Sequence, residues 1–304
     1  MSLLNVNICG VDFKNPVIAA SGTYGFGKDY TDFFPLERLG GISCKGTTLL
    51  PRLGNPPPRV AETASGILNS VGLQNPGVRH FISEDLPWLL EQNTVVIANA
   101  AGSTVEDYSE NVALLAQSGV HMIELNISCP NVKEGGVAFG TSCASVEKIV
   151  GAAKKVSGNK PLIVKLSPNV TSIAEIARAA ESAGADALSL INTITGMKID
   201  VDTRRPILRN NTGGLSGAAL LPVAVRMVWE VRRAVALPII GMGGVTKWQD
   251  AAELILAGAD AIQIGTACFA NPFAPPELIG GLEEWVQREG CANIAELSGR
   301  VRPW

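Results

Sequence analysis

The sequence predicts an α/β protein, a (β/α)8 barrel of the TIM type with a small N-terminal β-hairpin and long loops at its carboxyl-terminal mouth. Eight apolar runs of strand length recur along the 304 residues, and amphipathic stretches of helical period separate most of them. The runs are continuously apolar, which indicates strands buried on both faces, as in a parallel sheet covered by helices. A doubly wound open sheet is the alternative, but eight strands without a G-x-G-x-x-G motif after the first favour a closed barrel.

The expected elements follow one another in a regular order. A short hairpin over residues 6–12 precedes the first strand, and we expect it to close the bottom of the barrel. Strands are expected at residues 16–20, 41–44, 94–98, 122–126, 162–166, 187–191, 238–241 and 261–264. The clearest helices lie between strands, at residues 105–117, 145–156, 173–183, 223–236 and 249–256. No stretch resembles a linker and barrels of this length are common, so we predict one domain over residues 1–304.

A short pattern of helix end, glycine and strand occurs three times. It is found at residues 118–123, 183–188 and 257–262. Glycine readily adopts the left-handed conformation that ends a helix and lets the chain turn at once into a strand. The repetition supports an alternation of helices and parallel strands.

Composition and charge exclude several classes of protein. Hydrophobic residues make up 46% of the chain and charged residues 17%, which suits a large core. A formal net charge of −3 without clustered basic residues argues against a nucleic acid or an anionic membrane as the main partner. No apolar stretch approaches the roughly 20 residues of a membrane span, and no secretory signal is evident, so we expect a cytoplasmic protein.

Metal chemistry is not expected. The six cysteines never form a C-x-x-C pair, which disfavours a zinc or iron–sulfur site in this chain. Only two histidines occur, His80 and His121, and a half-buried or surface position is the simplest interpretation of both.

Polar residues and glycines follow the predicted strands, at the end where barrel enzymes bind their ligands. The glycines after the seventh and eighth strands are typical of a phosphate site, where backbone N–H groups meet an anion. Two lysines could neutralise negative charge that develops on the ligand, although a lysine at a strand end can also simply reach solvent. The residues are Ser21, Lys45, Gly46, Asn99, Asn126, Lys165, Asn192, Thr193, Gly243, Gly244, Gly265 and Thr266.

The segment after the fourth strand, residues 126–131 with the sequence NISCPN, carries the strongest chemical signature. Cys129 can act there as a base or nucleophile, and Asn126 and Asn131 can bind a small molecule rich in imide groups. A packed, inert cysteine is the alternative. The glycine-rich stretch 133–140 is interpreted as a mobile lid.

Together these motifs resemble the class 1 dihydroorotate dehydrogenases, the FMN-dependent barrel enzymes of pyrimidine synthesis, over nearly the whole chain. The resemblance rests on Ala20-Ser21-Gly22-Thr23, Lys45-Gly46-Thr47, residues 69–75, the NISCPN segment, Val164-Lys165-Leu166, Asn192-Thr193, residues 213–217 and Gly241-Met242-Gly243-Gly244. It implies an oxidoreductase that converts (S)-dihydroorotate to orotate on the route to UMP.

The resemblance also implies one FMN per chain, bound across the mouth. Lys165 is then expected beside the pyrimidine end of the flavin, and Lys45 between flavin and substrate. The implied phosphate ligands are Gly243, Gly244, Gly265 and Thr266, and the residues around the ring and ribityl chain are Ser21, Lys45, Gly46, Asn99, Asn126, Lys165, Ile191 and Gly217.

For the reaction itself, the resemblance implies Cys129 as the catalytic base, with Lys45 beside it. Dihydroorotate loses a proton from C5 and a hydride from C6, so one face of the substrate needs a base and the other needs flavin N5. A free thiol has a pKa of about 8.5, so the site must favour the thiolate or work best at mildly alkaline pH. The implied substrate ligands are Lys45, Asn69, Ser70, Val71, Gly72, Leu73, Asn126, Asn131, Asn192 and Thr193.

Within the family, residues 131–136 and 51–56 resemble the B type, which passes electrons to NAD through a second subunit that carries FAD and a [2Fe-2S] cluster. This implies a homodimer of barrels within a heterotetramer. The A type, a homodimer that uses fumarate, stays open as an alternative. The membrane-bound class 2 enzymes have an N-terminal extension and a serine base, and are not expected here.

Two hypotheses lie outside the family. A flavin-free phosphate-binding lyase could use Lys165 as a Schiff-base amine, but it would give Cys129 and the asparagines no role. A catalytically inactive barrel that serves as a scaffold would keep the apolar pattern alone, whereas here each expected polar position is filled.

Overall fold

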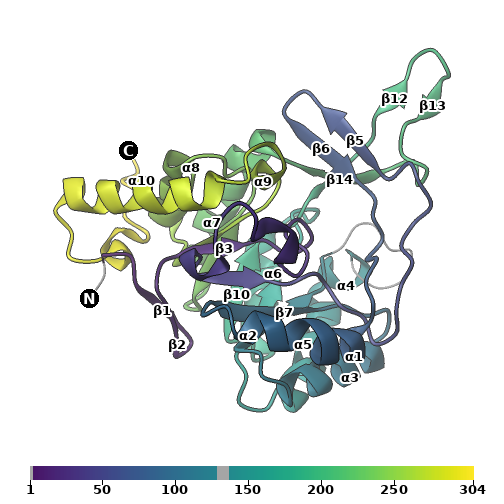
Figure 1. Cartoon of the computed structure of the whole chain (residues 1–304), viewed down its shortest axis with the longest axis horizontal. Helices are drawn as coiled ribbons and strands as arrows, with labels where there is room; N and C mark the ends of the chain where they lie inside the picture. Colours follow the sequence, from purple (N-terminus) through teal and green to yellow (C-terminus); the bar gives the residue numbers. More distant parts are fainter. Residues whose placement is uncertain (1–2, 129–136) are drawn as a thin grey trace.

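The computed structural model describes residues 3–128 and 137–304, and its centre is a closed barrel of eight parallel strands (Figure 1). The strands pair in the order β10-β15-β16-β3-β4-β7-β8-β9. All eight predicted strands and the predicted TIM barrel are confirmed. The strands are β3 Val17–Ala19, β4 Gly41–Ser43, β7 Val95–Ala100, β8 Met122–Asn126, β9 Leu162–Lys165, β10 Ala187–Leu190, β15 Ile239–Met242 and β16 Ala261–Ile264.

Helices surround the barrel, and the five predicted ones are confirmed with small differences at their ends. They are α3 Val105–Ala116, α5 Cys143–Val156, α6 Ile173–Ser182, α7 Leu221–Arg232 and α8 Trp248–Ala257. Neighbours pack side by side, α3 on α5, α5 on α6, α6 on α7 and α7 on α8, and α8 lies against α10 Ala274–Glu289. The shorter helical segments are η1 Lys28–Tyr30, η2 Leu36–Arg38, α1 Val78–His80, η3 Phe81–Asp85, α2 Leu86–Leu90, α4 Val137–Gly140, η4 Ala218–Leu220, α9 Ala267–Ala270 and η5 Ile294–Leu297.

The N-terminal hairpin is also confirmed. Strands β1 Val6–Ile8 and β2 Val11–Phe13 pair antiparallel. The Cys9 thiol in the turn donates to the carbonyl of Asp186, 3.2 Å away and directly before β10. The hairpin therefore lies at the amino-terminal end of the strands, opposite the mouth.

The two Gly-Ala-Asp segments place equivalent carboxylates at this lower end. Asp186 accepts a hydrogen bond of 2.7 Å from the N–H of Leu162, the first residue of β9. Asp260 accepts one of 2.8 Å from Ile239, the first residue of β15. Each carboxylate thus joins the start of its own strand to the start of the preceding strand in the sequence.

The predicted role of the three repeated glycines holds for two of them. Gly184 and Gly258 have φ angles of 99° and 123°, in the region that favours glycine. The interpretation is wrong for Gly119, which is not among the positive-φ residues. A Cβ on Gly119 would lie 2.6 Å from Cδ1 of Leu90 in α2, so a larger residue there would require this leucine side chain to shift.

A four-stranded antiparallel sheet stands beside the mouth where the sequence predicted only long loops. Its order is β11-β14-β6-β5, with β11 Ile194–Gly196, β14 Gly213–Ser216, β6 Gly66–Asn69 and β5 Val60–Thr63. A second pair, β12 Ile199–Asp200 and β13 Arg205–Pro206, projects away from the barrel (Figure 1, upper right). These strands are short, and three of them contain glycine, so they lack the hydrophobic period by which strands are recognised.

The main hydrophobic core fills the barrel and the space between its strands and the helices. In the described part of the chain, no helix is long and apolar enough to cross a membrane.

Candidate active site

Alternate strands of the barrel contribute one layer of interior side chains below the mouth. Four residues from β4, β8, β10 and β16 form this layer, and each is at most 1% exposed. TIM barrels usually fill such a layer with branched apolar side chains. Here all four are polar: Ser43, Glu124, Ser189 and Gln263.

Glu124 is the centre of this layer. Its Oε1 accepts hydrogen bonds from Ser189 Oγ at 2.8 Å and Gln263 Nε2 at 3.0 Å. Its Oε2 accepts from Ser43 Oγ at 2.8 Å and from Asn99 Nδ2 at 2.6 Å. Four neutral donors from four other strands therefore converge on one buried carboxylate.

Lys165, the last residue of β9, provides the opposite charge. Its Nζ lies 3.8 Å from Oε2 of Glu124, and its side chain is 5% exposed. Burial alone raises the pKa of the Glu124 carboxyl, but the ammonium of Lys165 and hydrogen bonds from the other layer residues lower it more. The pKa of Glu124 is thus below its ordinary value, and the carboxylate is charged at neutral pH.

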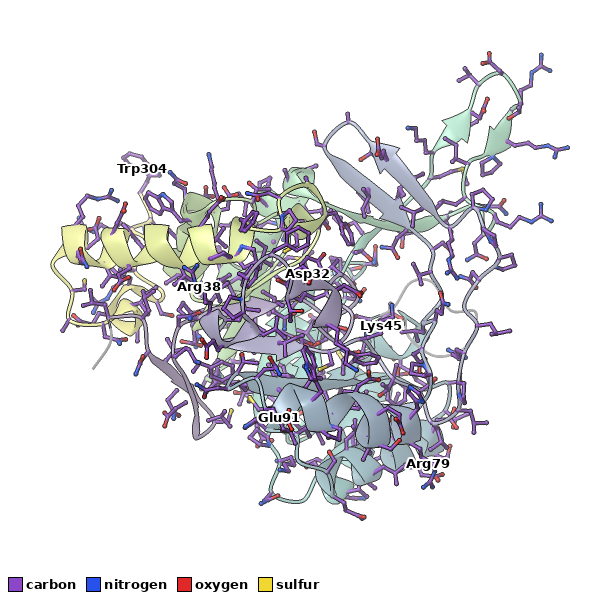
Figure 2. The ribbon with its side chains drawn as sticks, viewed as in Figure 1. Asp32, Arg38, Lys45, Arg79, Glu91 and Trp304 are labelled. Atoms are coloured by element: carbon purple, nitrogen blue, oxygen red, sulfur yellow. The ribbon has the colours of Figure 1, made fainter. Side chains whose placement is uncertain are left out.

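Predicted site residues follow this layer along the same four strands, and Asn126 still lies within its strand, β8. Side chains two residues apart on a strand point to the same face. The positions two residues beyond Ser43, Glu124, Ser189 and Gln263 are Lys45, Asn126, Ile191 and Gly265, all of which the sequence had assigned to the site. Lys45 is half-buried and lies on the side of the barrel that faces the antiparallel sheet (Figure 2).

A chain of side-chain hydrogen bonds joins three of the predicted asparagines. Asn99 Oδ1 accepts from Asn126 Nδ2 at 3.3 Å. Asn126 Oδ1 accepts from the hydroxyl of Ser128 at 3.1 Å, and that hydroxyl accepts from Asn192 Nδ2 at 2.8 Å. The ends of β7, β8 and β10 are connected in this way. Next to Asn192, Thr193 is held through its carbonyl, which accepts from Asn169 Nδ2 at 2.9 Å.

The predicted substrate loop, residues 69–73, approaches the barrel at Leu73. A Cβ on Gly46 would lie 2.7 Å from Asn99 Oδ1 and 3.5 Å from Leu73 Cδ2, so these three residues are neighbours. Leu73 has a φ of 55°, an uncommon conformation for a leucine. Gly72 has a φ of 75°, and a Cβ there would lie 2.6 Å from Asn55.

The beginning and the middle of this loop are held by other contacts. Ser70 is fully buried, and its carbonyl and hydroxyl accept from Asn55 Nδ2 at 3.0 and 3.2 Å. The carbonyl of Val71 accepts from the N–H of Asn55 at 2.9 Å. Asn69 lies in β6, and its Nδ2 donates to the Gly214 carbonyl at 3.4 Å. The side chain of Asn69 thus contacts β14 of the antiparallel sheet.

The glycines expected to hold a phosphate form tight turns after β15 and β16. Gly243 and Gly244 have φ angles of 122° and 82°. A Cβ on Gly243 would lie 3.1 Å from Ile191, and one on Gly244 would lie 2.4 Å from the backbone nitrogen of Leu221, where α7 begins. Only glycine permits this approach, which keeps the turn close to the first turn of a helix.

The remaining cofactor residues complete the rim on the β16 side. Gly265 lies beside the loop that holds Ser21, because a Cβ on it would be 3.4 Å from Ala20 Cβ. Thr266 donates to the hydroxyl of Ser216 at 2.8 Å, which ties the end of β16 to the antiparallel sheet. Gly217, with a φ of 116°, follows directly.

Cys129 and Asn131 lie outside the described residues, as do residues 133–136 of the predicted lid; residues 137–140 form α4. Two other buried thiols are described, Cys44 directly after β4 and Cys268 in α9. Burial raises the pKa of Cys44, and burial raises the pKa of Cys268 to about 12. Both remain protonated at neutral pH, so neither can serve as a base.

Other possible centres in the described part of the chain give no competing site. Among residues 3–128 and 137–304, no three His, Cys, Asp or Glu side chains are placed to hold a metal ion. His121 accepts a hydrogen bond from the N–H of Val96 at 3.0 Å and lies directly before β8, far from the strand ends. Its side chain is exposed, which agrees with the half-buried or surface position that the sequence indicated.

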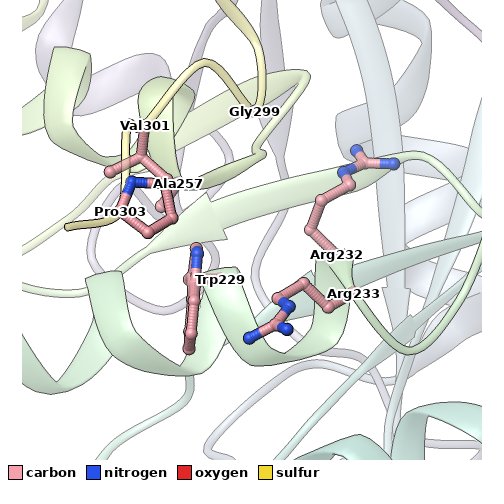
Figure 3. A pocket seen from close by; sticks show the side chains of 7 residues that line it. All are labelled: Trp229, Arg232, Arg233, Ala257, Gly299, Val301 and Pro303. Carbon is pink, nitrogen blue, oxygen red and sulfur yellow. The ribbon is translucent and has the colours of Figure 1, made fainter.

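A pocket of about 330 Å3 lies outside the barrel, between α7 and the C-terminal tail (Figure 3). No residue that the sequence assigned to the site lines it; its lining is Trp229, Arg232, Arg233, Ala257, Gly299, Val301 and Pro303. We place the site at the mouth, because the polar network and the paired charges are there.

Sequence reasoning missed Glu124 and its layer, together with Ser128, Asn169 and Ser216. A signal for the layer was present, since each member stands two residues before a predicted mouth residue on every second strand. Ser128 was part of the NISCPN segment but received no role.

The comparisons with known proteins agree over almost the full length. Residues 3–286 match the family model described as dihydroorotate dehydrogenase. A relative from Petrotoga mobilis is 53% identical, with 97% of this chain and 98% of the relative covered. One from Bacteroides fragilis is 52% identical, with 99% of each chain covered, and one from Bacillus pumilus is 53% identical, with 98% and 96% covered. All three are named dihydroorotate dehydrogenase B (NAD(+)), catalytic subunit.

Proposed function

This chain belongs to the dihydroorotate dehydrogenase family, and on that premise we propose that it oxidises (S)-dihydroorotate to orotate in the de novo synthesis of UMP. The observation that carries the proposal is the linked set of side chains at the mouth. Asn99, Asn126 and Asn192 are joined through Ser128, and the buried cation Lys165 pairs in register with Asn126. A polar planar ligand and a flavin both suit these groups.

The residues present are suited to FMN. The turns at Gly243, Gly244 and Gly265, with Thr266, offer backbone N–H groups and a hydroxyl to a phosphate. Lys165, nearly enclosed, is a cation that would face the pyrimidine end of the flavin. The ring and ribityl chain would lie against Ser21, Lys45, Gly46, Asn99, Asn126, Ile191 and Gly217. When bound, FMN supplies the hydride acceptor.

Cys129 is proposed as the base that takes the proton from C5 of the substrate. Its thiolate must face the side of the substrate that is turned away from the flavin. The mouth thiols Cys44 and Cys268 are held protonated by burial, which leaves this task to a different cysteine. Lys45, on the neighbouring layer above Ser43, would stabilise negative charge as the proton and hydride leave.

The asparagines would read the amide edges of the ring. Each side chain offers one acceptor and two donors, which match the N–H and C=O groups of a dihydropyrimidine. A buried polar group left without its partner costs about 1–3 kcal/mol, so analogues without these groups would be rejected. The proposed substrate set is Lys45, Asn69, Ser70, Val71, Gly72, Leu73, Asn126, Asn131, Asn192 and Thr193.

The names of the relatives support the B type, in which the electrons reach NAD. The words "catalytic subunit" in those names imply a further subunit. We propose that this subunit carries FAD and a [2Fe-2S] cluster and that two barrels form the centre of a heterotetramer. A single FMN-binding domain over residues 1–304 and a cytoplasmic location belong to the same proposal.

The test is an absorption spectrum of the purified chain. FMN should give a band at about 450 nm, and the band should bleach anaerobically when dihydroorotate is added. A colourless protein that takes up no FMN on reconstitution would contradict the proposal and favour a flavin-free lyase. A yellow protein that dihydroorotate does not bleach would support the proposed flavin and contradict the proposed substrate.

A further inference from the structure

A charged carboxylate in the centre of a barrel needs an explanation, because Glu124 belongs to none of the groups assigned above to cofactor or substrate. It is fully buried and receives four neutral hydrogen bonds. Taking a charge out of water is unfavourable, and apolar side chains of similar volume in place of a buried ion pair often leave a protein equally stable. The fold alone therefore does not require a glutamate in this layer.

The position of Glu124 relates it to the mouth. Its Oε2 lies 3.8 Å from Lys165 Nζ. That separation is too long for a hydrogen bond, so the ion pair orients the ammonium while its N–H donors can still serve a ligand. The same oxygen accepts from Asn99, which leads to Asn126 and Ser128.

We propose that Glu124 is a positioning residue that fixes Lys165 beneath the flavin and, through its negative charge, lowers the reduction potential of the bound FMN. The inference rests on the proposed function, since it requires a flavin above Lys165. It assigns the buried carboxylate a task in electron transfer: it limits how strongly the lysine favours the reduced flavin, so that the electrons can be passed on.

The direction of the effect follows from electrostatics. Reduction places negative charge on the flavin; the ammonium of Lys165 stabilises that charge, and a carboxylate on the same side destabilises it. Removal of the carboxylate charge, with the ammonium retained, should make reduction more favourable. The potential should therefore rise.

The experiment is a spectroelectrochemical titration of the FMN-loaded chain, wild type against Glu124→Gln, at pH 6. We expect the equilibrium constant for reduction to increase at least tenfold in the variant, about 30 mV for a two-electron couple. Glutamine suits the site because Gln263 Oε1 is buried without a hydrogen-bond partner among the described residues. If the side-chain amide of Gln263 rotates by half a turn, its Oε1 can accept a hydrogen bond from the amide of the glutamine introduced at position 124.

Ser189→Ala is the matched control. It removes one hydrogen bond to the same carboxylate but leaves the charge in place. The equilibrium constant for reduction of its FMN should stay within threefold of the wild-type value. An equal shift in Ser189→Ala and Glu124→Gln would mean that the layer acts only through packing, which overturns the inference.

Two further outcomes are decisive. If Glu124→Gln does not fold, Glu124→Asp withdraws the same charge by one methylene and should raise the equilibrium constant at least threefold. If the variant that folds has the same FMN reduction potential as wild type, the inference about Glu124 is overturned. The proposed function then still stands. A wild-type chain that binds no FMN overturns the proposed function and this inference with it.

Discussion

The side-chain amide of Asn192 donates a hydrogen bond of 2.8 Å to the hydroxyl of Ser128, and so joins the end of β10 to the residue directly before Cys129. The same hydroxyl donates to Asn126 at 3.1 Å. Ser128 is therefore the connection between two proposed substrate ligands and the proposed base. Its hydroxyl is fully buried, so water cannot replace either bond.

Replacement of Ser128 by alanine should leave the flavin bound but disturb the substrate site. Each lost hydrogen bond is worth about 0.5–1.5 kcal/mol, so we expect kcat/KM for dihydroorotate to fall roughly 5- to 100-fold. Stopped-flow reduction of the bound flavin measures this. Ser182→Ala is the control, because its hydroxyl donates to a carbonyl at the end of α6, at the opposite end of the barrel. Equal reduction rates in wild type and Ser128→Ala would show that the connection has no role in the reaction.

Replacement of Cys129 by alanine tests the proposed base. The variant should bind FMN normally but reduce it roughly 10²–10⁴-fold more slowly, the range over which a general base contributes. Cys129→Ser should keep a small activity that rises with pH. Cys143→Ala is the matched control, since Cys143 is a half-buried thiol at the start of α5. If flavin reduction is as fast in Cys129→Ala as in wild type, the cysteine is structural.

The two lysines should differ in what their loss affects. Lys45→Ala should impair both substrate binding and flavin reduction, because Lys45 is proposed to lie between flavin and substrate. Lys165→Ala should chiefly weaken FMN or its reduced form, and it also leaves Glu124 buried without its cation. Each effect should reach about tenfold or more, since hydrogen bonds to charged groups contribute about 1.5–3 kcal/mol. Unchanged kinetics and flavin affinity in either variant would remove that lysine from the site.

His121 should make folding stability depend on pH. Burial and the charge of Lys160 lower its pKa, and its Nδ1 accepts from the N–H of Val96. In the unfolded chain the imidazole binds a proton more readily, so the free energy of unfolding should fall as pH drops below about 6.5. His121→Gln should reduce this loss in urea titrations at pH 7 and pH 5. If the free energy of unfolding of His121→Gln falls between pH 7 and pH 5 as much as that of wild type, His121 is not the source of the pH dependence.

The strands and main helices could be predicted because their signal is local. Each barrel strand is a mainly apolar run, and the helices carry a 3.6-residue period. The polar strand ends were equally visible, and the structure brings Asn99, Asn126 and Asn192 into one hydrogen-bonded chain.

The remaining features depend on distant partners. Glu124 is a single polar residue within an apolar run, and its partners Ser43 and Gln263 are 81 and 139 positions away. Only the closed barrel brings them together. The antiparallel sheet was missed for the same reason, because β14 pairs with β6 through residues such as Gly214 and Asn69, which are far apart in the sequence, and neither strand has a periodic pattern of its own.

The last prediction concerns the route by which electrons leave the flavin. The sequence contains no C-x-x-C spacing for an iron–sulfur cluster, and its motifs lean toward the B type. We therefore expect a separate subunit with FAD and a [2Fe-2S] cluster to accept electrons from FMN and deliver them to NAD. Transfer between cofactors requires them to be close, so the subunit should bind near the mouth rather than near the β1–β2 hairpin. Steady-state assays of the barrel alone and with the candidate subunit measure this, and NAD reduction should depend on the subunit.

A change at the hairpin, such as Asn7→Ala, should leave the rate of NAD reduction by the complex unchanged. If the isolated barrel reduces fumarate efficiently, or reduces NAD without help, the partner hypothesis fails and the A type or another acceptor replaces it.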